Sequence, residues 1–166
     1  MDVYLSPEMK STGEAIGYDE RLTRALYKAL QASGMKVYNY GTILVSIADK
    51  DKNEALPLIK RFFNLGFNIE ATSGTAAFLK EHGIRTRVRA KLSEGSDEIL
   101  SALRRGYVSY VISTRDMNSF DEMSDGNQIR RCAVENNVNM FTSLDTVRVL
   151  LDVLEETTLC ISTIDA

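Results

Sequence analysis

The feature that most constrains the fold is a regular alternation of short apolar runs with longer stretches of helical periodicity. It begins at Gly41 and continues to the end of the chain. Strands that alternate with helices over short connections form a parallel sheet with right-handed crossovers and helices on both faces. We therefore predict an α/β three-layer sandwich of the Rossmann type around a five-stranded parallel sheet. The expected strands are residues 42–47, 67–71, 85–89, 107–112 and 139–141, with 159–164 as a candidate extra edge strand.

The expected helices fill the intervals between these strands. A helical spacing of apolar residues and Gly stop signals place them at 51–64, 75–81, 96–105, 127–136 and from Ser143 onward. Residues 117–126 are polar and are predicted to form a loop.

The first forty residues have a different pattern from the rest. A polar, glycine-punctuated segment precedes a helical pattern over 19–33, which ends at Gly34. The apolar stripe of that helix must pack on the following domain or on a domain outside this sequence. We accordingly divide the chain into residues 1–40 and residues 41–166.

Composition and charge exclude several classes of function. The formal net charge is -3 and no basic run occurs, so we expect no nucleic-acid partner. No apolar stretch is long enough for a membrane span, and the N-terminal residues lack a leader pattern, so we expect a cytoplasmic protein. Cys132 and Cys160 are isolated and predict reduced thiols rather than a metal site. His82 is the only histidine, so a Ser-His-Asp triad through any other histidine is excluded.

Small hydroxyl residues and a glycine follow the second predicted strand. Thr72, Ser73, Gly74 and Thr75 lie where a strand gives way to a helix, and ligands of such sheets bind at the carboxyl ends of the strands. Backbone N–H groups at a helix start favour an anion. A structural reading remains beside this one, in which Thr75 simply caps the helix.

The other predicted strand ends carry cations and hydroxyls as well. Lys52 and Lys91 follow the first and third strands, and Ser113, Thr114 and Arg115 follow the fourth. Their convergence predicts a site for a phosphate-sized anion. The alternative for Lys52 is a surface ion pair with Asp49 or Glu54. No Walker A loop or GxGxxG fingerprint is present.

Several strings taken together resemble the methylglyoxal-synthase-like domain. They are Thr42-Ile43-Leu44-Val45-Ser46, Asp51-Lys52, Gly66-Phe67, Ala71-Thr72-Ser73-Gly74-Thr75 and Ile129-Arg130-Arg131. More narrowly, they resemble the C-terminal allosteric domain of the carbamoyl phosphate synthetase large chain. The string Pro7-Glu8-Met9-Lys10-Ser11-Thr12-Gly13-Glu14 is similar to the end of the ATP-grasp half that precedes that domain.

The resemblance implies a regulatory domain without catalytic or metal-binding residues or a cofactor of its own. The parent synthetase uses ATP and Mg²⁺ and serves arginine and pyrimidine biosynthesis. Its effectors are of the UMP and IMP type in bacterial forms and acetylglutamate in urea-cycle forms. The implied partners are the rest of the large chain, the glutaminase small subunit and a second copy in an oligomer.

Residue by residue, the resemblance implies phosphate contacts at Lys52, Thr72, Thr75 and Lys91. It implies contacts near the sugar and base at Ser113 and Thr114. Ser113 replaces a frequent asparagine and Arg115 replaces a threonine. Thr142 matches a position implicated in ornithine activation, whereas Met140 replaces the family's tyrosine.

Two other functions remain as alternatives to the regulatory domain. The first is a lyase acting on dihydroxyacetone phosphate, as methylglyoxal synthase does. That family uses a carboxylate after a Gly-Gly turn and a late histidine, whereas this chain has Gly95-Ser96-Asp97 and no histidine after His82. The second is a structural or dimerisation domain that binds no nucleotide.

Overall fold

The computed structural model describes residues 20–32, 34–92, 95–114 and 120–165. The elements in chain order are α2 (Glu20–Ala32), β1 (Thr42–Ser46), the short 3₁₀ helix η1 (Asp49–Asp51), α3 (Lys52–Asn64), β2 (Asn68–Thr72), α4 (Ser73–Glu81), β3 (Arg87–Arg89), α5 (Glu98–Arg104), β4 (Val108–Ser113), α6 (Phe120–Glu135), β5 (Asn139–Phe141) and α7 (Leu144–Asp165).

The five strands form one sheet in the order β3-β2-β1-β4-β5, and all neighbouring strands run parallel. The predicted fold class is confirmed. The chain leaves β1 toward β2 on one side and returns to β4 on the other. The strand order therefore reverses between β1 and β4, where parallel α/β sheets form ligand crevices.

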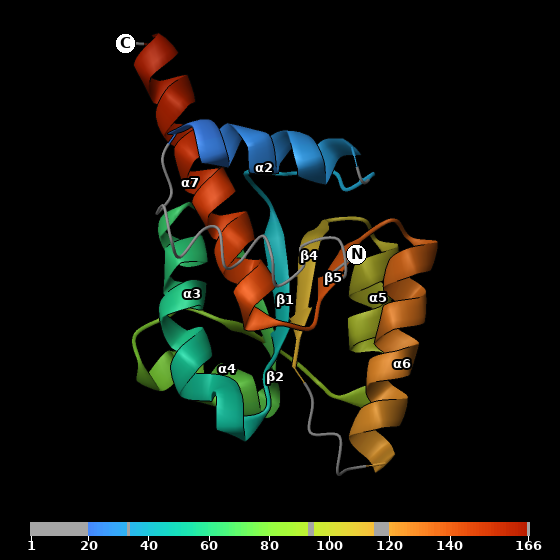
Figure 1. Ribbon diagram of the computed structural model, residues 1–166. Helices are drawn as coiled ribbons and strands as arrows, with labels where there is room; N and C mark the ends of the chain where they lie inside the picture. Colours follow the sequence, from blue (N-terminus) through green and yellow to red (C-terminus); the bar gives the residue numbers. More distant parts are fainter. Residues whose placement is uncertain (1–19, 33, 93–94, 115–119, 166) are drawn as a thin grey trace.

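Helices cover both faces of the sheet. Figure 1 shows α3, α4 and α7 on one face and α5 and α6 on the other. The first face holds the larger core, in which Tyr110 packs against Phe62, Phe67 and Phe141. The second face holds a smaller aliphatic core around Leu44, Leu103 and Val111. The alternation of residues along β1 feeds both cores, as expected for a strand buried on both faces.

Helix α2 packs against α7, beyond the amino ends of the strands (Figure 1). Leu30 of α2 is buried within the larger core, and so is Met35. The segment that follows is joined to β4 and β5. Tyr38 donates its N–H to the Tyr110 hydroxyl at 2.6 Å, and Asn139 donates an amide proton to the carbonyl of Lys36 at 3.0 Å. The described part of the apolar stripe therefore has a partner within the chain. The domain boundary at residue 40 stays a prediction.

The structure corrects two predicted elements. Residues 159–164 continue α7 and add no edge strand. The β-branched residues there suggested a strand, but no glycine or proline interrupts the helix, so it propagates. Residues 120–126 belong to α6 and are not a loop. Their polarity concealed the helical period on which the prediction relied.

Candidate functional site

Four strands deliver the predicted residues to the carboxyl edge of the sheet. β1 leads through η1 into Lys52, the first residue of α3. β2 leads directly into α4, whose first residues are Ser73 and Gly74, both exposed. Lys91 follows β3, and Ser113 is the buried last residue of β4. Arg115, the ninth predicted site residue, lies outside the described residues.

Lys52 lies next to residues 72–75 at the start of α4, which we call the α4 cradle. A Cβ built on Gly74 would lie 3.7 Å from the Lys52 ammonium, with no other atom outside the adjoining chain within 4 Å. The same ammonium donates to Asp49 Oδ1 at 2.5 Å. The surface ion pair between Lys52 and Asp49 is thus present, and its ammonium lies next to Gly74. The absence of a side chain on Gly74 leaves the space that a small ligand needs between ammonium and backbone.

Lys91 adds a second positive charge to this group. The pKa of Asp49 is lowered from its usual value, first by the hydrogen bond from Lys52 and by its charge, and further by the charge of Lys91. Two lysines from different strand ends therefore act on one exposed carboxylate. A carboxylate that attracts both lysines occupies a position that favours negative charge.

The start of α4 offers donors at this position. Its N-cap residue, Thr72, makes no side-chain capping bond. The first N–H groups of a helix have no partner within it, and the helix dipole places partial positive charge there. The open donors, Gly74 and the Lys52 ammonium thus share one small region.

The Thr75 hydroxyl has a structural role. It accepts the N–H of Ile47 at 3.0 Å and lies 3.4 Å from the Ile47 carbonyl. Thr75 and Thr72 are both buried, and their hydroxyls lie 3.4 Å apart. Thr75 therefore binds the turn after β1 to the start of α4. The alternative that Thr75 caps its own helix is therefore wrong. The N-cap of α4 is Thr72, and the Thr75 hydroxyl bonds to Ile47 in the turn after β1.

Thr114, just after β4, also binds the turn that follows β1, from the other side of that strand. Its hydroxyl accepts the N–H of Ala48 at 2.9 Å, and its own N–H donates to the Ser46 carbonyl at 3.0 Å. Two threonines thus hold consecutive residues of the turn that carries Asp49 and Lys52. Sequence spacing had placed these hydroxyls near a ligand but could not reveal that the chain itself uses them.

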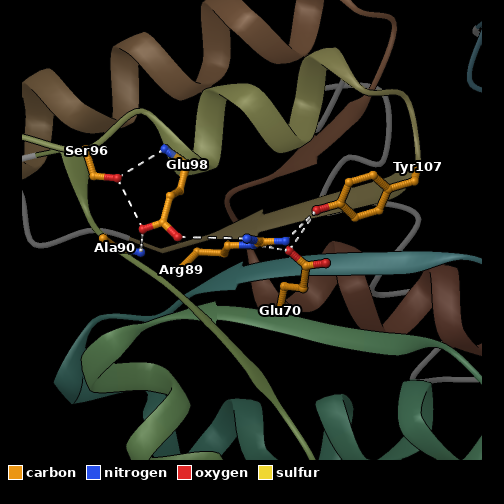
Figure 2. A network of polar contacts seen from close by, with 6 residues as sticks. All are labelled: Glu70, Arg89, Ala90, Ser96, Glu98 and Tyr107. Carbon is orange, nitrogen blue, oxygen red and sulfur yellow. Dashed lines mark hydrogen bonds and ion pairs between the residues drawn. The ribbon is translucent and has the colours of Figure 1, made fainter.

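A polar network fixes the segment that carries Lys91. Arg89 donates to Glu70 Oε1 at 2.6 Å and to the Tyr107 hydroxyl at 3.1 Å, and Tyr107 donates to the same Glu70 oxygen at 3.0 Å (Figure 2). On the far side of Arg89, Glu98 accepts the N–H of Ala90 at 3.0 Å. Bonding to Glu70 raises the pKa of Arg89. The chain leading to Lys91 is therefore tied to β2 and α5.

A cleft of about 460 Å³ opens beside η1 and the first turn of α3, where the strand order reverses between β1 and β4. Its lining residues are Lys50, Asp51, Glu54, Ser113, Thr114, Arg130, Thr142, Ser143, Leu144 and Asp145. Of the predicted site residues it takes in Ser113 and Thr114. Lys50 and Arg130 were not predicted as site residues, because only the packing of η1 and α6 brings them to the β4 end.

The residues considered for catalysis are dispersed. His82 follows the last turn of α4, where its ring N–H donates to the Phe78 carbonyl at 2.8 Å. α4 is nine residues long at about 1.5 Å each, so His82 lies at the opposite end of this helix from Ser73 and Gly74. Asp97 is exposed at the N-cap of α5 and makes no capping bond. Asp51, the N-cap residue of α3, makes no capping bond either.

The topology and the strand-end residues define a doubly wound parallel α/β domain with a polar carboxyl edge. The model of the MGS-like domain family matches residues 54–142. The chain belongs to the MGS-like domain family. Among solved structures it is similar to methylglyoxal synthase from Elizabethkingia anophelis NUHP1, with a TM-score of 0.59, 21% sequence identity, and coverage of 69% of this chain and 79% of that chain.

In the part of the chain that the structure describes, no helix combines the length and apolarity needed to cross a bilayer.

Proposed function

We propose that this chain is a regulatory domain of the carbamoyl phosphate synthetase type, and that it binds a nucleoside monophosphate at the carboxyl edge of its sheet. The observation that carries the proposal is the placement of the Lys52 ammonium over Gly74, at the first turn of α4. An ammonium, open helix N–H groups and an uncrowded glycine form a site suited to a phosphate dianion.

Binding begins with a change of partner for Lys52. The phosphate accepts hydrogen bonds from the first N–H groups of α4 and takes the place of Asp49 beside the ammonium. Asp49 is almost fully exposed, with 94% of its side-chain surface accessible, so it moves into solvent at little cost. Lys91 supplies the second charge.

The remainder of the nucleotide occupies the cleft at the β1–β4 reversal. Ser113 and Thr114 lie at its β4 side, and its volume of about 460 Å³ falls within the range of small-ligand sites. Both cationic and anionic residues line it, together with four hydroxyls. Such a lining suits a sugar and a polar base better than an apolar group.

Regulation requires the rest of the synthetase. An effector changes activity only through its different affinities for two arrangements of this domain and its neighbours. In this proposal ATP and Mg²⁺ act in the remainder of the large chain, and the glutaminase subunit is a further partner. By itself, this domain binds the effector but catalyses no reaction.

The lyase is the second candidate, because a solved structure with this fold is a methylglyoxal synthase. A lyase acting on dihydroxyacetone phosphate needs a base within reach of the carbon that loses its proton. His82 is at the far end of α4, which leaves Asp97 as the carboxylate to test. Methylglyoxal formed from dihydroxyacetone phosphate by this chain, and abolished in Asp97→Ala, would replace our proposal.

Calorimetric titration with UMP, IMP and acetylglutamate tests the binding site. Lys52→Ala and Lys91→Ala are each expected to weaken monophosphate binding by about 1.5–3 kcal/mol, the contribution of a hydrogen bond to a charged group. Lys80→Ala removes an equal charge from the exposed last turn of α4 and should leave affinity unchanged. Equal affinity in all three variants would exclude this pocket, and no heat from any ligand would favour a purely structural domain.

A further inference from the structure

A second and larger groove lies at the opposite end of the strands. Its volume is about 1010 Å³, and its walls include the first residues of β1, β2 and β3, the residues just before β3 and β4, and the end of α3. The groove also runs along β3 as far as Arg89, the last residue of that strand, which is in register with Thr72. None of its lining residues lines the cleft of about 460 Å³ or belongs to the predicted anion site, so the groove is distinct from the site proposed above.

Four arginines line this groove, against one glutamate. Arg89 is paired with Glu70, whereas Arg85, Arg87 and Arg105 are exposed and form no ion pair with any residue that the structure describes. The half-buried arginines Arg61 and Arg148, in contrast, each pair with two carboxylates. In a chain of net charge -3, three arginines without carboxylate partners in one hollow form a local positive field.

The Glu70 carboxylate does not neutralise that field. It lies 2.6 Å from Arg89 and accepts a further bond from Tyr107, and it is buried. Its negative charge is therefore balanced by Arg89 within the network of Figure 2. The other three guanidinium groups come from separate segments: the turn before β3, β3 itself and the end of α5.

We propose that this groove binds a small molecule carrying a chain of two or more phosphate groups. Guanidinium groups recognise phosphate through paired N–H donors and cannot lose their charge at ordinary pH. A single phosphate would fill a small part of 1010 Å³, whereas a chain extends between arginines from different segments. Inorganic oligophosphates and nucleoside di- and triphosphates share this chemistry.

Calorimetric titration of the whole chain with inorganic tripolyphosphate tests the inference. Arg87→Gln combined with Arg105→Gln should weaken binding by at least about tenfold, because each replaced group donates to a charged acceptor. Arg104→Gln is the matched control, since Arg104 neighbours Arg105 and is exposed but does not line the groove. It should leave the affinity unchanged.

A second variant separates this groove from the carboxyl edge. Lys52→Gln combined with Lys91→Gln should retain tripolyphosphate binding that still depends on Arg87 and Arg105. A parallel titration with a nucleoside triphosphate distinguishes the two sources, and Phe63→Ala should weaken only the nucleotide if its base contacts the exposed Phe63 ring. Absence of binding, or binding lost with the lysines and kept without the arginines, would overturn the inference.

Discussion

The two ends of the same parallel strands carry different kinds of polar residue. At the carboxyl end, lysines and threonines surround a helix start, and a carboxylate already neutralises one lysine. At the amino end, arginines line a hollow, and tyrosine and serine hydroxyls bind the chain that enters the sheet. Polar residues at a strand end thus serve either the fold or a ligand, and their hydrogen-bond partners distinguish the two roles.

By this criterion Thr75, Thr114, Ser109 and Tyr110 serve the fold, because each bonds to a main-chain group of another segment. Among the residues that the structure describes, the side chains of Lys52 and of the groove arginines Arg85, Arg87 and Arg105 make no such bond.

Gly41→Ala should cause the largest loss, at the amino end. Gly41 has φ +112°, and an added Cβ would lie 2.1 Å from the Ser109 hydroxyl oxygen. Strained backbone together with a clash should lower the free energy of unfolding by about 2–4 kcal/mol, measured by urea denaturation.

Gly34→Ala is the control for that variant, because Gly34 has φ +88° and open space around its Cβ. It should cost about 1–2 kcal/mol, the price of the left-handed backbone alone. Equal losses in the two variants would mean that the close approach to Ser109 has no energetic weight.

Thr75→Val tests the structural role at the carboxyl end. It leaves the buried Ile47 N–H without its acceptor, so the free energy of unfolding should fall by about 1–3 kcal/mol. Thr75→Ser keeps the hydroxyl and should recover most of that loss in the same denaturation experiment. If Thr75→Val weakened nucleotide binding without loss of stability, the hydroxyl would belong to the ligand site.

Asp49→Asn should have the smallest effect, and it should strengthen binding. Asp49 competes with an incoming phosphate for Lys52, so removing its charge should tighten monophosphate affinity by about two- to fivefold, measured by calorimetry. Weaker binding in this variant would mean that Asp49 positions Lys52 for the ligand.

The same pair predicts the pH dependence. The pKa of Asp49 is held below its usual value, so this carboxylate keeps its charge as pH falls from 8 to 5. The phosphate monoester gains a proton near a pKa of about 6. Binding should therefore weaken below that pH in the parent chain and in Asp49→Asn alike. An affinity that rises on acidification in the parent chain alone would contradict this account.

Much of the fold was predictable because the hydrophobic period of each element is local. Val147, Leu150, Leu151 and Leu154 recur at helical spacing and are all buried on α7. The polar start of α6 was missed because it lacks an apolar stripe, and the end of α7 was missed because its β-branched residues suggested a strand. For the site, the rule that strand ends meet at one edge predicted that Lys52 lies near the start of α4, and its ammonium does lie close to Gly74. That these residues bind an effector stays a prediction.

The parallel α/β architecture and the edge at which Lys52 and Gly74 meet follow from the amino-acid sequence, because strand and helix periods depend on neighbours along the chain. Tertiary packing, in contrast, settled which hydroxyls bond to the chain itself. It also decided that four arginines, separated by up to twenty residues, share a groove with the end of α3. Hydrogen bonds and hollows join distant segments, and their partners are fixed only when the sheet and its helices have packed.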